Sequence, residues 1–190
     1  ITYGGSCSSS DTSADADNNT VTFNTLSDAS YSDCTVLVTD NASNASAELS
    51  VTTFVIDTIA PTVEEVSAVT TPSSDNTSSY TFSSNDSGTI TYGGSCSSST
   101  SSASSGNNAI TFNALADGSY SDCTIIVTDN ASNASTALSV STFVIDTTGP
   151  TLSEVTAVST PIADSTPSYT FYSNEAGTIS YGGSCSSSTS

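Results

Sequence analysis

The chain has 190 residues and 19 carboxylates but no Lys, Arg or His, so its formal net charge is −19. Because no cation is available to pair with a phosphate, binding to nucleic acid or to an anionic membrane surface is electrostatically disfavoured. Without a His or Lys base, only a carboxylate pair of the glycosidase type is left for catalysis, and no run of 18 apolar residues occurs. We therefore expect a protein that is not an enzyme and does not insert into a membrane.

The sequence repeats itself with a period of 89 residues. ITYGGSC at 1–7 recurs at 90–96 and returns as ISYGGSC at 179–185, and most other residue pairs at this spacing are identical. We expect residues 1–58 to be the C-terminal part of a repeat (strands C to G), 59–147 a complete repeat, and 148–190 the N-terminal part of another (strands A to C). Because the sequence begins and ends inside a repeat and contains no Met, further repeats are expected on both sides.

The apolar residues of the complete repeat fall in short runs separated by Ser, Gly, Asn and Asp, which is typical of β-strands and turns. In chain order the predicted strands are A (62–69), B (79–83), C (89–93), a short D or C′ piece within 97–106, E (109–113), F (120–129) and G (136–146). The alternation in F slips by one residue near 121–123, which predicts a β-bulge there. Short strands at this spacing predict an all-β fold of tandem immunoglobulin-like β-sandwiches.

The cysteines are expected to form one disulfide per repeat. Cys7 and Cys34 are 27 residues apart, as are Cys96 and Cys123, while the partner of Cys185 would fall at position 212, outside the sequence. A thiolate metal site is disfavoured because the paired C-x-x-C spacing and His are missing. The bond between Cys96 and Cys123 would join strands C and F within one sheet. Since disulfides persist outside the reducing cytosol, we expect an extracellular or cell-surface protein.

Two further features are expected at the ends of each repeat. A Tyr follows the turns at 26–30 and 115–119, where its hydroxyl can bond back to the chain as a tyrosine corner. The junctions FVIDTIAPT (54–62) and FVIDTTGPT (143–151) leave only a short, Pro-containing linker between successive repeats, which predicts a stiff, rod-like arrangement.

Oxygen donors are predicted to meet at these junctions. In a sandwich, the incoming strand, the B–C loop and the F–G loop share one end of the domain, and their carboxylate and amide oxygens are the ligands that Ca²⁺ prefers. The predicted metal-binding residues are Asp57, Asn85, Asp86, Asp129 and Asn133 at the first junction, and Asp146, Asn174 and Glu175 at the second. The alternative is that these residues serve only as turn formers at strand ends.

The segment LADGSYSDCTIIVTDNASNASTALSVSTFVIDTTGPT (115–151) resembles the bacterial Ig-like repeats of giant surface adhesins and biofilm-associated proteins. The resemblance covers essentially the whole chain. It implies a long extracellular filament or stalk without catalytic activity, whose junctions are rigidified by Ca²⁺. The chain departs from the family at NASN (130–133), where a Gly more often precedes the second Asn, and in its disulfide.

Two functions follow from these patterns. The first is structural, with neighbouring repeats as partners in a fibre that is either one covalent chain or separate copies completing each other by strand donation. The alternative is a module that binds carbohydrate or a solid surface, for which Tyr92 and Tyr181, each beside a Gly-Gly pair, are the candidate binding residues. The frequent N-x-S triplets are weak signals for glycans in a chain this rich in Ser.

Overall fold

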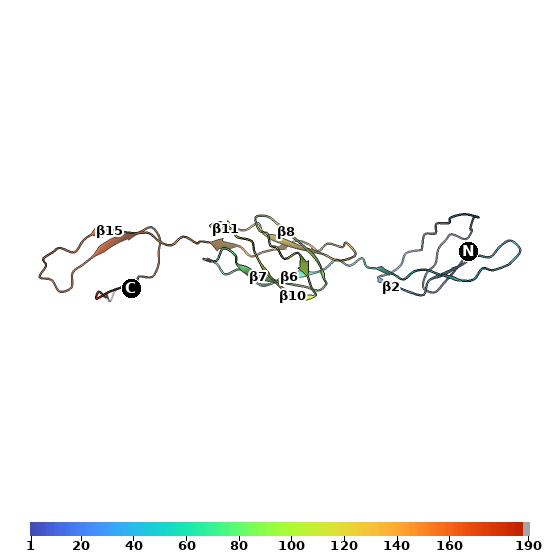
Figure 1. Cartoon of the computed structure of the whole chain (residues 1–190), viewed down its shortest axis with the longest axis horizontal. Coiled ribbons are helices and arrows are strands. Elements are labelled where there is room, and N and C mark those ends of the chain that lie inside the picture. Colours follow the sequence, from blue (N-terminus) through green and yellow to red (C-terminus); the bar gives the residue numbers. More distant parts are fainter. Residues whose placement is uncertain (188–190) are drawn as a thin grey trace.

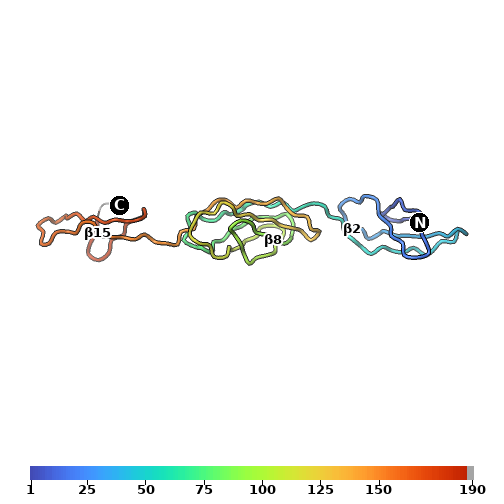
Figure 2. Tube along the Cα trace, turned by 90° about the horizontal axis from the view of Figure 1, so that it is seen from above, coloured from blue at the N-terminus to red at the C-terminus, as the bar shows by residue number. Residues whose placement is uncertain are grey.

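A computed structural model describes residues 1–187, whose regular elements are all β-strands (Figure 1). Three units lie in a row along the long axis, with residues 1–58 at one end, the central repeat in the middle and residues 148–187 at the other end (Figures 1 and 2). Among these residues there is no helix that could cross a membrane. The chain is therefore all-β, as the sequence predicted.

The central repeat contains two main antiparallel sheets and a small third one. One sheet has the order β10-β7-β6, the second β13-β12-β8-β9, and the third pairs β11 with β14. The bounds are β6 (Val63–Ser67), β7 (Ser79–Ser84), β8 (Gly88–Gly93), β9 (Ser102–Ala103), β10 (Gly106–Thr111), β11 (Gly118–Tyr120), β12 (Thr124–Thr128), β13 (Leu138–Ser139) and β14 (Phe143–Ile145).

The predicted strands A, B, C and E correspond to β6, β7, β8 and β10, and β9 is the short piece expected in the Ser-rich loop. Strands F and G are each divided in two. The predicted bulge at 121–123 is instead a break, because β11 pairs with β14 whereas β12 pairs with β8 and β13. The register shift lies in strand A, between Glu65 and Ser67 opposite β7. The chain therefore changes sheets where the alternation slips.

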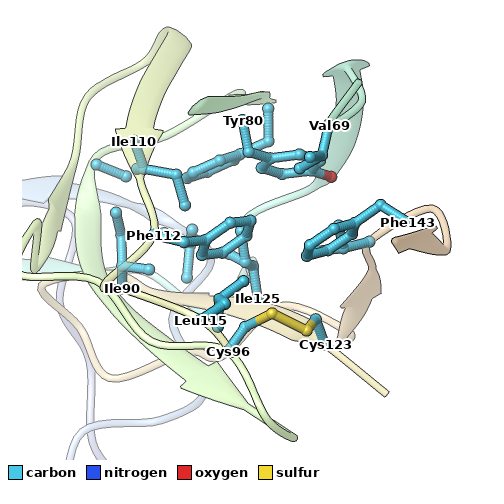
Figure 3. Packing of buried hydrophobic residues seen from close by; sticks show 14 of the residues in the cluster. Val69, Tyr80, Ile90, Cys96, Ile110, Phe112, Leu115, Cys123, Ile125 and Phe143 are labelled. Atoms are coloured by element: carbon cyan, nitrogen blue, oxygen red, sulfur yellow. A yellow bond between two sulfur atoms is a disulfide. The ribbon is translucent and has the colours of Figure 1, made fainter. Parts of the chain in front are cut away.

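The core of the central repeat is built around a row of stacked rings. Phe112 lies between Tyr80 and Phe143, with ring centroids 5.9 and 6.0 Å apart, and Tyr120 stacks on Phe143 at 5.2 Å. Tyr80 lies in β7 and Phe112 directly follows β10 of the same sheet, whereas Tyr120 and Phe143 lie in the β11–β14 pair, so the rings connect these two sheets (Figure 3 labels Tyr80, Phe112 and Phe143). The apolar side chains on the inward faces of the strands, such as Ile90, Ile110 and Ile125, pack around these rings. Burial of their apolar area is the main stabilising contribution to the fold.

Both predicted disulfides are present. Cys7 bonds to Cys34 and Cys96 to Cys123, with Cα atoms 5.3 and 5.2 Å apart. The second bond lies at one edge of the core, next to the Gly93–Thr124 pair that ends the β8–β12 ladder (Figure 3). It thus joins two strands of one sheet, as expected. The thiol of Cys185 is exposed and forms no disulfide.

The repeated YGGSC motif is what brings each cysteine to its partner. Gly94 has φ +72, a left-handed conformation, and a Cβ at this position would collide with the backbone carbonyl of Asp122. The turn directs the Ser95 hydroxyl to donate to the Asp122 carboxylate at 2.8 Å. Cys96 follows immediately and faces Cys123. Gly5 approaches the carbonyl of Asp33 in the same way, so the motif makes the same close approach at both disulfides of the structure.

The tyrosine corner is also present in both copies. The hydroxyl of Tyr120 donates to the carbonyl of Ala116 at 2.8 Å, and that of Tyr31 donates to the carbonyl of Ser27 at the same distance. Each bond closes the turn that precedes the second cysteine. The sequence prediction is confirmed at both positions.

The N-terminal unit contains the counterparts of strands C, F and G. Its strands are β1 (Thr2–Gly4), β2 (Ala29–Tyr31), β3 (Thr35–Leu37), β4 (Leu49–Ser50) and β5 (Phe54–Ile56), in sheets ordered β1-β3-β4 and β2-β5. The predicted strand E is reduced to one bridge between Ser9 and Phe23. Its fully buried core consists of Cys7, Tyr31 and Cys34.

The C-terminal unit is a hairpin of β15 (Leu152–Thr156) and β16 (Thr170–Ser173). Its register shifts between Glu154 and Thr156, at the position equivalent to the shift in β6. The expected strand C near 179–183 is not a strand among the described residues. These strands therefore reproduce A and B of the central repeat without its other strands.

Candidate functional site at the junction between repeats

The linker between β5 and β6 is hydrogen-bonded on both sides. From the preceding unit, Asp28 accepts hydrogen bonds from the hydroxyl of Thr58 at 2.9 Å and from its amide at 3.2 Å. From the following repeat, the side-chain amide of Asn133 donates to the carbonyl of Asp57 at 3.0 Å. These contacts fix the linker to the units on either side of it.

Three carboxylates converge where this linker reaches the central repeat. Oxygens of Asp57, Asp86 and Asp129 all lie within 4.8 Å of one another. Asp57 comes from the linker, Asp86 from the β7–β8 turn and Asp129 from the end of β12, and only Asp129 is buried. Two oxygens bound to one Ca²⁺ at about 2.4 Å are at most about 4.8 Å apart, so this spacing fits a shared ion.

The buried Asp129 also organises its own loop. Its carboxylate accepts hydrogen bonds from the amides of Ala131 and Asn133, both at 2.8 Å, and from the side chain of Asn133 at 2.9 Å. Burial by itself raises the pKa of Asp129, but the hydrogen bonds from Asn133 and from the loop amides outweigh it and lower the pKa below its ordinary value. Asp129 is therefore held as an anion by its surroundings.

Ser132 in this loop has φ +74, and its counterpart Ser43 has φ +69. Left-handed conformations are unfavourable for residues with a Cβ, and Gly adopts them freely. A Gly is the ordinary residue at such a position. The loop therefore keeps its shape with Ser in place of Gly, supported by the bonds to the preceding Asp.

The two predicted amide ligands have other roles. The side-chain oxygen of Asn85 accepts a hydrogen bond from the Thr62 amide at 2.7 Å, which fixes the start of strand A. Asn133 directs its NH₂ group, and not its oxygen, towards Asp57 and Asp129. The structure thus brings all five predicted residues of the first junction together, with three as carboxylates around one point and two as hydrogen-bonding supports.

The second junction repeats part of this arrangement. The side-chain oxygen of Asn174 accepts from the Thr151 amide at 2.6 Å, as Asn85 does from Thr62. Asp146 accepts from the amide of Thr148 at 3.2 Å, and Glu175 occupies the place of Asp86. The counterpart of Asp129 would be residue 218, outside the sequence, and among the described residues Asp146 and Glu175 are not part of a group of three carboxylates.

Tyr92, proposed for surface binding, is half-buried and packs against the core of the central repeat. Its hydroxyl donates to the carbonyl of Thr100 at 2.7 Å, and burial raises its pKa against the lowering effect of Ser98. Tyr3 makes the equivalent bond to Asp11 at 2.9 Å. Tyr92 thus anchors the Ser-rich loop, whereas Tyr181 is 47% exposed.

The sequence analysis did not predict that Asp28 and Asp117 accept hydrogen bonds from the linker that follows each unit. We call this contact the Asp–Thr clamp. Asp117 accepts from the hydroxyl of Thr147 at 2.7 Å, from its amide at 2.9 Å, and from the hydroxyl of Thr148 at 2.8 Å. The signal was available, because an Asp before the F strand and a Thr after the G strand occur together in both copies.

We predict that Thr147→Val raises the pKa of Asp117. The hydrogen bonds from Thr147 and Thr148 lower this pKa from its ordinary value, so removing the first hydroxyl moves it back upwards. The stabilisation from Asp117 is complete above its ordinary pKa and is lost as the pH falls through its lowered value. Carboxyl-carbon NMR titration measures the shift. Asp75, whose pKa is lowered by Thr77, is the internal control and keeps its value.

Comparison of the chain with family models, with curated proteins and with solved structures found no significant match.

Proposed function

We propose that this chain is a structural, non-catalytic segment of a long extracellular filament or adhesin stalk. The observation that carries the proposal is the recurring attachment of each linker: Asp28 to Thr58 and Asp117 to Thr147 on one side, with Asn85 to Thr62 and Asn174 to Thr151 on the other. A short linker bonded at both ends passes the orientation of one repeat to the next, which is what a stiff stalk requires.

Immunoglobulin-like sandwiches are the proposed building blocks. The sheet orders β10-β7-β6 and β13-β12-β8-β9 correspond to E-B-A and G-F-C-C′, and the Tyr120 corner belongs to the same fold. The two disulfides are typical of proteins outside the reducing cytosol, which supports an extracellular location. The resemblance to adhesin repeats supports the same reading.

We further propose that Ca²⁺ bound by Asp57, Asp86 and Asp129 stiffens the first junction. Three carboxylates so close repel one another, and the chain has no cationic side chain to neutralise them. A divalent cation removes this repulsion and links the linker, the β7–β8 turn and the F–G loop through one ion. Asn133 holds the carboxylate of Asp129 and the backbone carbonyl of Asp57 in position.

Small-angle scattering tests this proposal. With Ca²⁺ we expect a longer maximum dimension for the 190-residue chain than with chelator, because the junction bends more freely once the ion is removed. Asp86→Asn is expected to abolish the calcium response. Asp15→Asn removes the same charge from an exposed loop of the N-terminal unit, outside the site, and is expected to leave the response intact. Identical profiles in Ca²⁺ and chelator, with no calcium found by elemental analysis, would show that the aspartates are turn formers only.

A further inference from the structure

The first and last segments of the central repeat run side by side. Residues 71–73, which follow β6, lie beside β14, with a parallel bridge between Ser73 and Ile145. The amide of Ser73 donates to the carbonyl of Val144, and the amide of Asp146 donates to the carbonyl of Ser73, both at 2.9 Å. The segment at which the chain enters the repeat is therefore bonded directly to the segment at which the chain leaves it.

Side chains add three hydrogen bonds to this contact. The Glu65 carboxylate in β6 accepts from the hydroxyl of Ser141 at 2.6 Å and from its amide at 2.9 Å. The hydroxyl oxygen of Thr71 accepts from the amide of Val144 at 2.9 Å. We call these three bonds and the two backbone bonds of Ser73 the A–G interface, which joins residues 65–73 to residues 141–146.

Glu65 is held as an anion within the A–G interface. Burial by itself raises the pKa of this half-buried carboxyl group, but the hydrogen bonds from Ser141 outweigh burial and lower the pKa below its ordinary value. A hydrogen bond to an ionised acceptor is roughly twice as strong as one between neutral groups. The two bonds from Ser141 are therefore the strongest in the interface.

The direction of the two segments determines how tension acts on them. The linkers leave the central repeat at opposite ends of the long axis (Figures 1 and 2), so tension along the chain pulls the first segment one way and the last segment the other. The segments are parallel, because Glu65 meets Ser141 and, further along both, Ser73 meets Ile145. Hydrogen bonds between neighbouring strands run from strand to strand and not along them. Tension therefore acts on all the bonds of the interface together instead of opening them one after another.

We infer that the A–G interface is the contact that resists tension applied to the central repeat through its two linkers, and that its rupture limits the rate of unfolding under force. The disulfide does not provide this link, because Cys96 and Cys123 join β8 to β12, which both lie between the two segments in the sequence. The inference rests on the proposed stalk for its biological role, whereas the interface can be tested on the chain alone.

Single-molecule force spectroscopy of the full 190-residue chain tests the inference. Handles are attached at Ile59→Cys and Gly149→Cys in a Cys185→Ser background. Both attachment positions are exposed and flank the central repeat, so tension passes through this repeat alone. Chelator is present throughout, so that an ion at the junction contributes nothing. The unfolding rate at constant force is the measurement, because forced unfolding is governed by the rate of unfolding and not by the equilibrium stability.

Glu65→Ala is expected to raise the unfolding rate under force about tenfold or more, because it removes hydrogen bonds to a charged group that are already broken in the transition state. Thr71→Val preserves the shape of the side chain, removes one neutral hydrogen bond and is expected to raise the rate about threefold. The second variant keeps the inference testable if the first does not fold.

Asn108→Ala is the matched control. The Asn108 side chain makes three hydrogen bonds, to the amide and carbonyl of Ser104 and to the carbonyl of Gly106, and these connect neither the first nor the last segment. The variant is expected to lower the stability against denaturant and to leave the unfolding rate under force unchanged. Equal acceleration by Asn108→Ala and Glu65→Ala, or no acceleration by Glu65→Ala and Thr71→Val, would overturn the inference. Either result would leave the stiffness of the junction, which scattering measures, unaffected, so the two proposals fail independently.

Discussion

Phe112→Ala is expected to lower the free energy of unfolding of the central repeat by about 3–5 kcal/mol, the range for removing a large aromatic side chain from a close-packed core. Phe112 is 1% exposed and stacks on rings from both sides. The same change at Phe23, its counterpart in the N-terminal unit, is expected to cost less than half as much, because Phe23 is only half-buried there. Hydrogen exchange of β10 and β12 amides measures the first effect, and exchange of β3 amides the second.

Phe23 and Phe112 have identical residues on either side in the sequence, Thr before and Asn after. The difference between the two losses of stability therefore measures what β6 and β7 contribute to the burial of Phe112. Equal losses at the two positions would mean that the N-terminal unit is as well packed as the central repeat.

Removal of the Cys96–Cys123 disulfide is also expected to reduce the stability of the central repeat strongly. Replacing both residues with Ala is expected to lower the stability of the central repeat by about 3 kcal/mol, because an open loop of this length gains conformational freedom in the unfolded chain. The ladder between β8 and β12 ends beside the bond, so exchange of the Gly93 and Thr124 amides should accelerate most. Protection of these amides by denaturant-dependent hydrogen exchange is the measurement.

Cys185→Ala provides the control for the disulfide experiment. Its thiol is exposed and forms no disulfide, so its replacement is expected to leave the exchange rates unchanged. An unchanged stability of the double variant would show that core packing alone defines the central repeat.

Much of the fold was predictable because the strands are short, regularly spaced and repeated. The all-β class, the two 27-residue disulfides and the tyrosine corners of Tyr31 and Tyr120 follow from spacing alone. The division of strands F and G did not follow. A slip in alternation near 121–123 indicates an irregularity, but whether it is a bulge or a change of sheet depends on pairing partners far away in the sequence.

The residues of the candidate site could be predicted from the sequence, but the roles of the two Asn residues could not. Asp57, Asp86 and Asp129 could be predicted to lie together, because this requires only that three segments of the chain share one end of the repeat. It does not determine which atom of Asn133 faces them, since an amide side chain can donate or accept. The clamp of Asp117 on Thr147 was missed because it depends on a contact across the opposite end of the repeat.

The position of the disulfides also determines how far the chain can be stretched. A force applied to the two ends of a repeat is transmitted from Cys96 to Cys123 through the sulfur atoms, so the 27-residue segment between them bears no tension. At about 3.3–3.6 Å per extended residue, roughly 90 Å of chain is withheld from the extension of an unfolded repeat. The same limit applies between Cys7 and Cys34. Each disulfide therefore limits how far its repeat can extend when it unfolds under force. A reductant would free the segment between the two cysteines to extend as well.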